Sequence, residues 1–273
     1  MMFTFDFIDF AEKVAHKYIV KDAWGNEIDI RNVELVLTTS MLKLWACYKS
    51  VDHYLECCAA NHYTFGIAKV TPRALESMRT TNYQYLQYLK LDDGQIDELI
   101  GPTMDEIKAV VGGDYRRTIL FLRGLDINSD NAERGADPIP LALMAEPRMI
   151  DDPHIKRRVW GMIERRIRDA KIGVLNVHGN YSILCGDPYA LCQSMFGLEV
   201  TGLLKAGELY NKYWLDAGVP EVACFRAPMT SRNNVKVLSV AANDDMRYWY
   251  QYMTTCTMLN AWDTTSQALN GAD

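Results

Sequence analysis

The chain has 273 residues and a mass of 31.1 kDa, with 49% hydrophobic and 23% charged residues. This composition supplies enough apolar surface for a large core, so intrinsic disorder is excluded as the main property. The chain has 29 Lys and Arg and 35 Asp and Glu, so its formal charge is -6. This charge does not favour binding to nucleic acid or to an anionic membrane. Such a contact therefore requires a local cluster of basic residues.

The sequence does not indicate membrane association or a structural zinc site. No apolar run approaches the roughly 18 residues needed to cross a bilayer, and no basic segment precedes an apolar one at the start. We therefore expect a cytoplasmic protein without a membrane partner. The seven cysteines contain no Cys-x-x-Cys pair, which favours reduced, packed thiols over structural zinc.

Apolar spacing divides the chain near residue 150, with helical periodicity before this point and strand-like runs after it. Four helices are predicted in the first part, at 9–20, 41–58, 72–90 and 102–112. Ser40 is the expected N-cap of the second helix, whose apolar stripe is expected to lie in the core. The polar stretch 126–140 is expected to form a long loop, so residues 1–150 form a mostly helical region.

The second part begins with Asp152-Pro153, which is typical of a helix start and predicts a helix to about Lys171. Short β-prone runs follow at 171–175, 181–185, 208–214, 221–226 and 235–240, and a last helix is predicted over 244–259. Short strands at close spacing predict a small β barrel within residues 151–273. The expected fold class is therefore α+β.

The predicted helix after residue 152 carries the chain's one local basic cluster. Its basic residues are Lys156, Arg157, Arg158, Arg165, Arg166, Arg168 and Lys171, against only Glu164 and Asp169. A solvated helix face is the simpler interpretation of this pattern. The functional alternative is contact of Lys156, Arg157, Arg158, Arg165 and Arg166 with a nucleic-acid backbone, since clustered Lys and Arg release counterions from phosphates.

Familiar catalytic motifs are absent, including a Gly-rich phosphate loop, a Gly-x-Ser-x-Gly elbow and His-Glu-x-x-His. A hydrolase is therefore poorly supported. Two other segments stand out. Phe225-Arg226-Ala227-Pro228 closes a predicted strand, and Asn270-Gly271-Ala272-Asp273 ends the sequence.

In this order, and beside a predicted small barrel, these two segments resemble the catalytic double-psi barrel of two-barrel RNA polymerases. The resemblance is closest to the cellular RNA-dependent RNA polymerases of the RNA-silencing type and their bacterial or phage relatives. In that family an Arg-Ala-Pro or Arg-Asn-Pro segment precedes a loop with three aspartates. Weaker similarities lie at Thr39–Lys43, Asn82–Gln87, Lys171–Leu175, Ile183–Asp187 and Gly202–Tyr210, so the resemblance covers about residues 35–273.

The resemblance implies a helical N-terminal region followed by most of a double-psi β-barrel. It implies Mg²⁺-dependent nucleotidyl transfer, with nucleoside triphosphates and an RNA or DNA template as partners. Asp273 would be a catalytic, metal-binding aspartate, since Mg²⁺ prefers hard oxygen ligands. Arg226 would contact the sugar of a nucleotide, because guanidinium is a permanently charged planar donor. Pro228, Asn270 and Gly271 would shape the nucleotide-binding loop.

The sequence departs from the family pattern because only Asp273 of the three aspartates is present. We therefore expect a fragment of a single-chain polymerase that is inactive as written, and no lysine of a second barrel is assigned. One alternative is a non-catalytic nucleic-acid-binding protein that uses residues 156–171. Another is a structural barrel protein without a ligand. The template type, the priming mode and the oligomeric state stay open.

Overall fold

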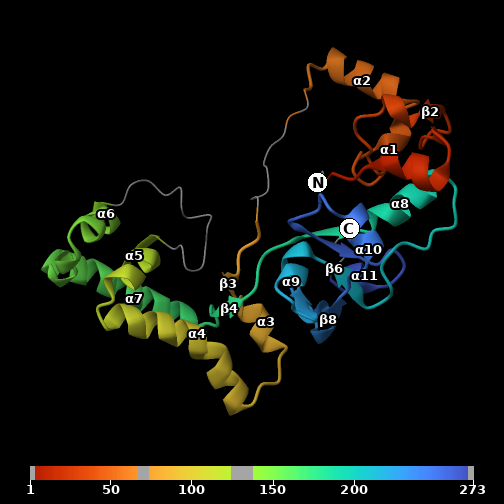
Figure 1. Cartoon of the computed structure of the whole chain (residues 1–273). Coiled ribbons are helices and arrows are strands. Elements are labelled where there is room, and N and C mark those ends of the chain that lie inside the picture. The colour runs from red at the N-terminus through yellow and green to blue at the C-terminus, as the bar shows by residue number, and fades with distance from the viewer. Residues whose placement is uncertain (1–3, 65, 67–73, 124–137, 270–273) are drawn as a thin grey trace.

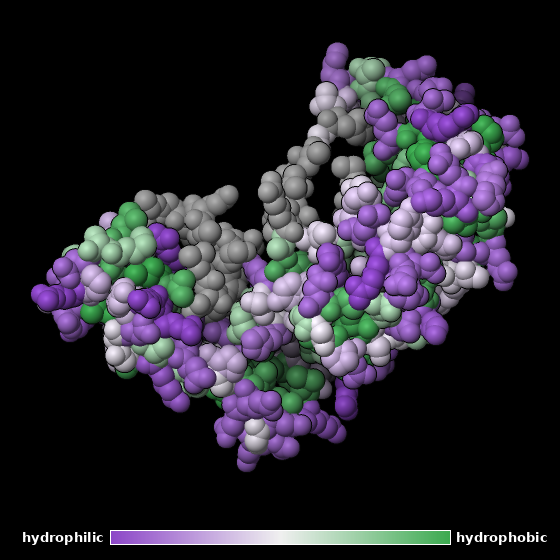
Figure 2. Space-filling view, viewed as in Figure 1, coloured by the Kyte–Doolittle hydropathy of each residue, from purple (hydrophilic) through white to green (hydrophobic). Residues whose placement is uncertain are grey.

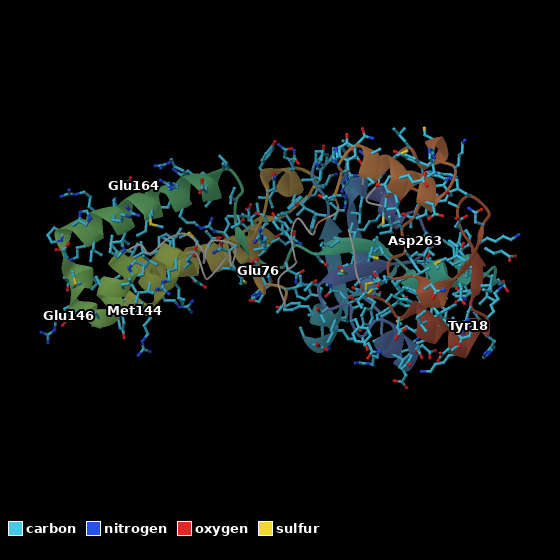
Figure 3. All side chains as sticks on the ribbon, turned by 90° about the horizontal axis from the view of Figure 1, so that it is seen from above. Tyr18, Glu76, Met144, Glu146, Glu164 and Asp263 are labelled. Carbon is cyan, nitrogen blue, oxygen red and sulfur yellow. The ribbon has the colours of Figure 1, made fainter. Side chains whose placement is uncertain are left out.

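The computed structural model describes residues 4–64, 66, 74–123 and 138–269, which form two lobes (Figure 1). The helical lobe contains α4 to α7, and the sheet lobe contains the C-terminal strands together with the N-terminal elements. Seen from above, Glu146 and Glu164 lie in the helical lobe, Tyr18 and Asp263 lie in the sheet lobe, and Glu76 lies between them (Figure 3).

The helical lobe packs around the apolar side of one long helix. Its helices are α4 (Asp93–Val111), α5 (Tyr115–Arg123), α6 (Pro138–Ala145) and α7 (Pro153–Lys171). Ile155, Val159 and Ile163 recur at four-residue spacing on α7, so they share one face, and all three are buried. They pack with residues of the other three helices such as Ile107 and Leu143.

A buried polar network joins α7 to α4 and to the chain that leaves the lobe. The Arg166 guanidinium lies 3.1 Å from the Glu106 carboxylate and donates to the Val174 carbonyl and the Asn176 side chain. Asn176 in turn donates to Glu106, and its backbone N–H donates to Thr103. Arg166 is thus buried with its charge compensated, as a buried guanidinium requires.

A two-stranded antiparallel ladder follows this network and leads to the sheet lobe. Strand β3 (Met78–Thr80) pairs with β4 (Asn176–His178), and α3 (Tyr83–Gln87) follows β3. The Thr81 hydroxyl donates to the Gly173 carbonyl and accepts from the Leu175 N–H, which extends the contact beyond the ladder.

The sheet lobe contains a mixed five-stranded sheet in the order β5-β9-β6-β8-β7. Its strands are β5 (Ile183–Gly186), β6 (Glu208–Tyr210), β7 (Glu221–Phe225), β8 (Val235–Val240) and β9 (Cys256–Leu259). The β5/β9 and β6/β8 pairs are parallel, whereas β6/β9 and β7/β8 are antiparallel. Four short helices connect or follow these strands: α8 (Pro188–Met195), α9 (Lys212–Asp216), α10 (Asp244–Trp249) and α11 (Thr265–Ala268).

The N-terminal elements pack on the sheet lobe. They are α1 (Phe7–Phe10), a π-helical turn at Ala11–Ala15, β1 (Ile19–Lys21) and β2 (Glu27–Asp29), and α2 (Val51–Ala60) follows them in the chain. Phe10 is fully buried among Tyr189, Phe196 and Trp249. Packing therefore crosses the predicted division at residue 150, and α7, which follows that division, packs with helices that precede it.

A buried carboxylate fixes α8 against α10. Asp187 caps α8 by accepting from the Tyr189 and Ala190 N–H groups, and it also accepts from the Leu203 N–H at 2.7 Å. The Tyr250 hydroxyl donates to the same carboxylate at 2.6 Å. Burial, followed by the nearby Asp187 charge, raises the pKa of Tyr250, so the phenol remains protonated as the donor.

Three predicted helices differ in the structure. The predicted helix at 41–58 is replaced by α2, which Ser50 rather than Ser40 caps through a bond to the His53 N–H. Leu44 adopts a left-handed backbone conformation. Met41, Leu44, Val51 and Leu55 are all exposed, so the expected core stripe is wrong for most of its residues. Within the predicted helix 72–90, the described residues form β3 and α3 instead. The predicted helix 9–20 ends at Ala15, where His16 is left-handed.

Two further predictions have the wrong boundaries. The helix expected from Pro102 begins at Asp93, because Asp92 and Gln95 form a capping box, and Pro102 lies inside it. The helix expected over 244–259 ends at Trp249, and β9 follows. The strand predicted at 171–175 is instead the end of α7 and the turn after it, while most of the loop predicted at 126–140 lies outside the described residues.

Other predictions are confirmed. The strands at 221–226 and 235–240 are β7 and β8, and the helix after Asp152 is α7 with Asp152 as its N-cap. Helices and sheets together agree with the α+β class. All seven cysteines are free thiols. Within the described residues, no helix combines the length and the apolar character that a bilayer crossing needs.

We expect Tyr250→Phe to lower the free energy of unfolding by about 1.5–3 kcal/mol, because a buried carboxylate loses a hydrogen-bond donor. Urea unfolding followed by circular dichroism measures this change. Tyr252→Phe is the matched control, since Tyr252 is exposed, and we expect a change within about 0.5 kcal/mol. Equal effects of the two substitutions would contradict a role of the Asp187 bond in stability.

Candidate functional site

A cavity of about 850 Å³ lies between the five-stranded sheet and the segment that carries β3, α3 and β4. Strands β5, β7 and β9 supply one wall, and residues 79–89 and 177–182 supply the other. Much of the lining is apolar and includes Leu184, Leu209 and Val222. Polar groups lie among them at Arg79, His178, Asn180 and Arg226. An apolar cavity with a few polar groups is the usual form of a ligand site.

Arg226 lies at the end of β7, where the strand turns into the Ala227-Pro228 segment. The side chain is half-buried and lines the cavity. Its Nη1 donates to the Leu269 carbonyl at 3.3 Å. Leu269 is buried and directly precedes Asn270. The structure thus brings Arg226 to the point where the predicted Asn270–Asp273 loop begins.

Asn234 makes a second connection between this turn and the end of α11. Its side-chain oxygen accepts from the N–H groups of Thr230 and Ser231, each at 2.9 Å. Its Nδ2 donates to the Ala268 carbonyl at 2.6 Å. Asn234 is buried, so the amide orientation is fixed by these partners. Two adjacent carbonyls, those of residues 268 and 269, are therefore held by the segment 226–234.

The α3 helix contacts the same turn from the opposite side. The Gln84 side chain accepts from the Met229 N–H at 3.3 Å, and the Tyr85 and Phe225 rings lie 4.9 Å apart. The segment Asn82–Gln87, which carried one of the weaker family similarities, therefore lies beside Arg226. Thr39–Lys43, which carried another, forms a turn between β2 and α2 whose described bonds are local.

Sequence reasoning missed most of the polar residues of this cavity. Arg79 pairs with Glu76 at 2.8 Å and lies over the Tyr181 ring at 4.1 Å. Asn180 has a buried side-chain nitrogen without a hydrogen-bond partner among the described residues. The Asn211 amide, the Thr257 hydroxyl and the Ser182 hydroxyl form a connected network below the cavity. These residues come from separate segments, so no local motif marks them.

The cavity wall shifts the ionisation of its titratable groups. Burial raises the pKa of the Cys224 thiol to about 11 and also raises the pKa of Tyr85. Both groups are therefore neutral at physiological pH. The formally charged side chains of the lining are Arg79, Arg226 and Glu221.

The predicted metal ligand cannot be placed, since Asn270, Gly271 and Asp273 lie outside the described residues. Among the residues that are described, no three His, Cys, Asp or Glu side chains lie close enough together to hold a metal ion. Arg226 and Pro228 are the two predicted nucleotide-binding residues that the structure places.

The predicted nucleic-acid contacts on α7 divide into two groups. Lys156, Arg157, Arg158 and Arg165 are exposed, and Lys156 lies 2.8 Å from Asp151. Arg166 is buried in the network with Glu106 and Asn176 and is not part of the exposed basic face. Its position on the helix explains the difference, since residue 166 follows the buried residues 155, 159 and 163 at three- and four-residue spacing.

The raised pKa of Cys224 predicts slow alkylation at neutral and mildly alkaline pH. The thiolate is the reactive form, and a pKa of about 11 in place of 9 lowers its fraction roughly 100-fold at pH 8. We expect iodoacetamide to modify exposed Cys47 well before Cys224 in the folded protein, as mass spectrometry of digests can measure. Similar rates at both residues would contradict the burial of Cys224.

The bond between Asn234 and Ala268 predicts a local effect of Asn234→Asp. This change keeps the accepting oxygen but places a carboxylate against the Ala268 carbonyl. We expect amide hydrogen exchange at residues 268 and 269 to accelerate about 10-fold, which is the effect of losing about 1.4 kcal/mol. Asn233→Asp is the control, because Asn233 lies in the same turn and is exposed. Unchanged exchange in the Asn234 variant would refute the connection.

Comparison with known proteins relates the chain to RNA polymerases. No protein-family model matches the chain, and no solved structure is significantly similar to it. It is 30% identical over 226 residues to the DNA-directed RNA polymerase YonO of Bacillus phage SPbeta. The matched region is 79% of this chain and 26% of the phage protein, so the chain spans about a quarter of that relative. The chain is therefore similar to part of a phage RNA polymerase.

Proposed function

We propose that this chain is part of a single-chain RNA polymerase and that residues 151–273 belong to its catalytic double-psi barrel. In the proposed reaction the 3′-hydroxyl of a growing RNA would attack the α-phosphate of a nucleoside triphosphate. A phosphodiester bond would form and pyrophosphate would be released. The observation that carries this proposal is the contact between Arg226 and Leu269. It joins residues 43 positions apart in the chain. Arg226 belongs to one of the segments that resemble the family motifs, and Leu269 directly precedes the other.

The sheet topology supports a barrel of this kind. Each parallel pair, β5/β9 and β6/β8, has long intervening chain between its strands. The two pairs meet along the antiparallel β6/β9 contact. Two parallel pairs joined in opposite directions make a sheet with approximate internal symmetry, which agrees with the proposed double-psi arrangement. We propose that the cavity beside β5 and β7 is the interior face of this barrel.

Arg226 is the residue that we propose for contact with the nucleotide. Its guanidinium lies at the cavity wall, where the planar donors suit a sugar hydroxyl or a phosphate oxygen. Pro228 has no N–H and restricts the backbone of the turn that follows Arg226. Asn270 and Gly271 begin immediately after the Leu269 carbonyl that Arg226 holds, so we propose them as the start of the nucleotide-binding loop.

Asp273 is the aspartate that we propose as a ligand of Mg²⁺ in the complete enzyme. Two metal ions acting on an attacking and a leaving oxygen need several carboxylate ligands, and one aspartate does not supply them. We therefore propose that the 273-residue chain by itself does not synthesise RNA. The similarity to about a quarter of a phage polymerase supports this view, because other parts of such an enzyme would then lie in other sequence.

The proposal also concerns whether the template is RNA or DNA. The sequence resemblance implied an RNA-dependent enzyme, whereas the phage relative is named a DNA-directed RNA polymerase. We propose nucleic acid as the template, and the relative's name favours DNA. A direct comparison of DNA and RNA templates of one sequence separates the two.

A second candidate is a nucleic-acid-binding protein without catalysis, and the exposed basic residues of α7 favour it. Lys156, Arg157, Arg158 and Arg165 are exposed. Contact of such residues with phosphates weakens steeply as salt rises and needs no Mg²⁺. This contact is also compatible with a polymerase. Catalysis therefore distinguishes the two candidates, and binding alone does not.

We expect a longer chain, continued past Asp273 through the following part of its gene, to incorporate ribonucleotides on a template only when Mg²⁺ is present. Arg226→Lys should lower incorporation about 10- to 100-fold, which corresponds to the loss of about 1.5–3 kcal/mol from one charged hydrogen bond. Primer or template extension with radiolabelled nucleotides measures this. Removal of Mg²⁺ with EDTA should abolish the signal.

Arg232→Lys is the matched control for this experiment, because Arg232 lies in the same turn and is exposed. We expect it to keep the activity of the unchanged enzyme. Full activity of the Arg226 variant would contradict the nucleotide contact. Binding of nucleic acid without incorporation by the longer chain, in the presence of Mg²⁺, would favour the non-catalytic candidate.

A further inference from the structure

The middle of α7 exposes a tryptophan to solvent. Trp160 is 55% exposed, although the helix buries Val159 and Ile163 on either side of it in the sequence. A large aromatic ring left at a helix surface gives up the free energy of burial and commonly marks a contact site. The indole Nε1 donates to the Glu164 carboxylate at 3.0 Å, one turn further along, which restricts the orientation of the ring.

A hollow of about 540 Å³ lies beside this ring, between the end of α4 and the first half of α7. Trp160, Lys156 and Arg157 line it together with Gly112 and Gly113. Val159 and Ile163 add apolar side chains to the same lining. The hollow therefore combines an aromatic ring, an apolar wall, two cationic side chains and the Asp151 carboxylate, which lies 2.8 Å from Lys156 Nζ. Its glycines carry no side chains that narrow it.

Basic residues extend from Trp160 in both directions along one face of α7. Arg157, Trp160, Glu164, Arg168 and Lys171 follow each other at three- and four-residue spacing, which places them in one stripe. All five are exposed, and Lys156 flanks the stripe. The whole helix carries seven basic and two acidic residues in a chain whose net charge is -6. Figure 2 shows strongly hydrophilic side chains over the outer part of the helical lobe.

We propose that this stripe and the hollow beside it, called the Trp160 surface, bind single-stranded nucleic acid. One base stacks on the Trp160 ring, and the neighbouring phosphates contact Lys156 and Arg157. Aromatic side chains interleaved with cations are how proteins hold single strands without reading their sequence. A duplex fits less well, because the faces of its bases are covered by their neighbours. The nucleic-acid partner follows from the proposed function, whereas the stacking contact and the preference for single strands are additional.

The test measures the affinity of the 273-residue chain for a fluorescein-labelled DNA of 12 mixed-sequence nucleotides, by anisotropy at low salt. We expect Trp160→Ala to raise the Kd about 5- to 100-fold, which corresponds to the usual contribution of one stacked base. Trp160→Phe should restore most of the affinity, because it retains an aromatic face. The same DNA as a duplex should bind more weakly and should be little affected by Trp160→Ala.

Two further variants separate stacking from a general effect of charge or folding. Tyr252→Ala is the matched control, since Tyr252 is also 55% exposed but lies in the sheet lobe, and it should leave the Kd unchanged. Glu164→Gln removes the one negative charge of the stripe and should tighten binding. Arg157→Ala should lower the slope of log Kd against log salt by about 1, as expected for the loss of one phosphate contact. Circular dichroism verifies that each variant is folded.

Absence of measurable binding by the folded chain to the single strand at low salt would overturn the inference. So would equal affinities of the unchanged chain and Trp160→Ala, or tighter binding of the duplex than of the single strand. None of these results bears on nucleotide incorporation by the longer chain, which depends on Arg226. Conversely, a longer chain without polymerase activity would leave the Trp160 result intact, so the two proposals fail separately.

Discussion

Strand β9 is the element on which the sheet lobe depends. It is buried along its whole length and pairs with β5 on one side and β6 on the other. Without this strand the sheet would separate into β5 alone and the β6-β8-β7 group. A strand buried on both faces must be apolar or have its polar atoms paired, and the one polar side chain of β9 meets this condition. The Thr257 hydroxyl accepts a hydrogen bond from the Asn211 amide and donates one to the Ser182 hydroxyl.

The position of β9 also determines where the candidate site forms. The ten residues after the strand return along the lobe, and Asp263 holds them by accepting from the Gly207 N–H and capping the start of α11. The chain then reaches Asn234 and Arg226, which hold the carbonyls of residues 268 and 269. The side chain at position 226 therefore meets the end of α11 because two separate anchors, β9 and Asp263, direct the chain there.

The sequence predicted elements well where one local signal dominates. The β-branched valines of 235–240 and the Asp152-Pro153 start of α7 are such signals, and both elements form as predicted. β9 was missed because the Tyr- and Met-rich run 244–259 suits a helix, although Thr254, Thr255 and Thr257 favour a strand. The apolar stripe at 41–58 was misjudged for another reason. Apolar periodicity shows which residues share a face, but it does not show that another element covers that face.

The candidate site was predictable only in part, because local sequence patterns do not show which residues tertiary packing brings together. Arg226 and Pro228 belong to a short segment that a family resemblance can mark, whereas Arg79, Asn180 and Ser182 reach the cavity through tertiary packing. Packing likewise decides the roles of neighbouring arginines that composition treats as equivalent. Arg165 and Arg166 are adjacent, and a rotation of about 100° between them places the first in solvent and the second against Glu106. Helix α7 thus stabilises the connection between the lobes through Arg166, while its other basic side chains are exposed to solvent, where they can bind a polyanion.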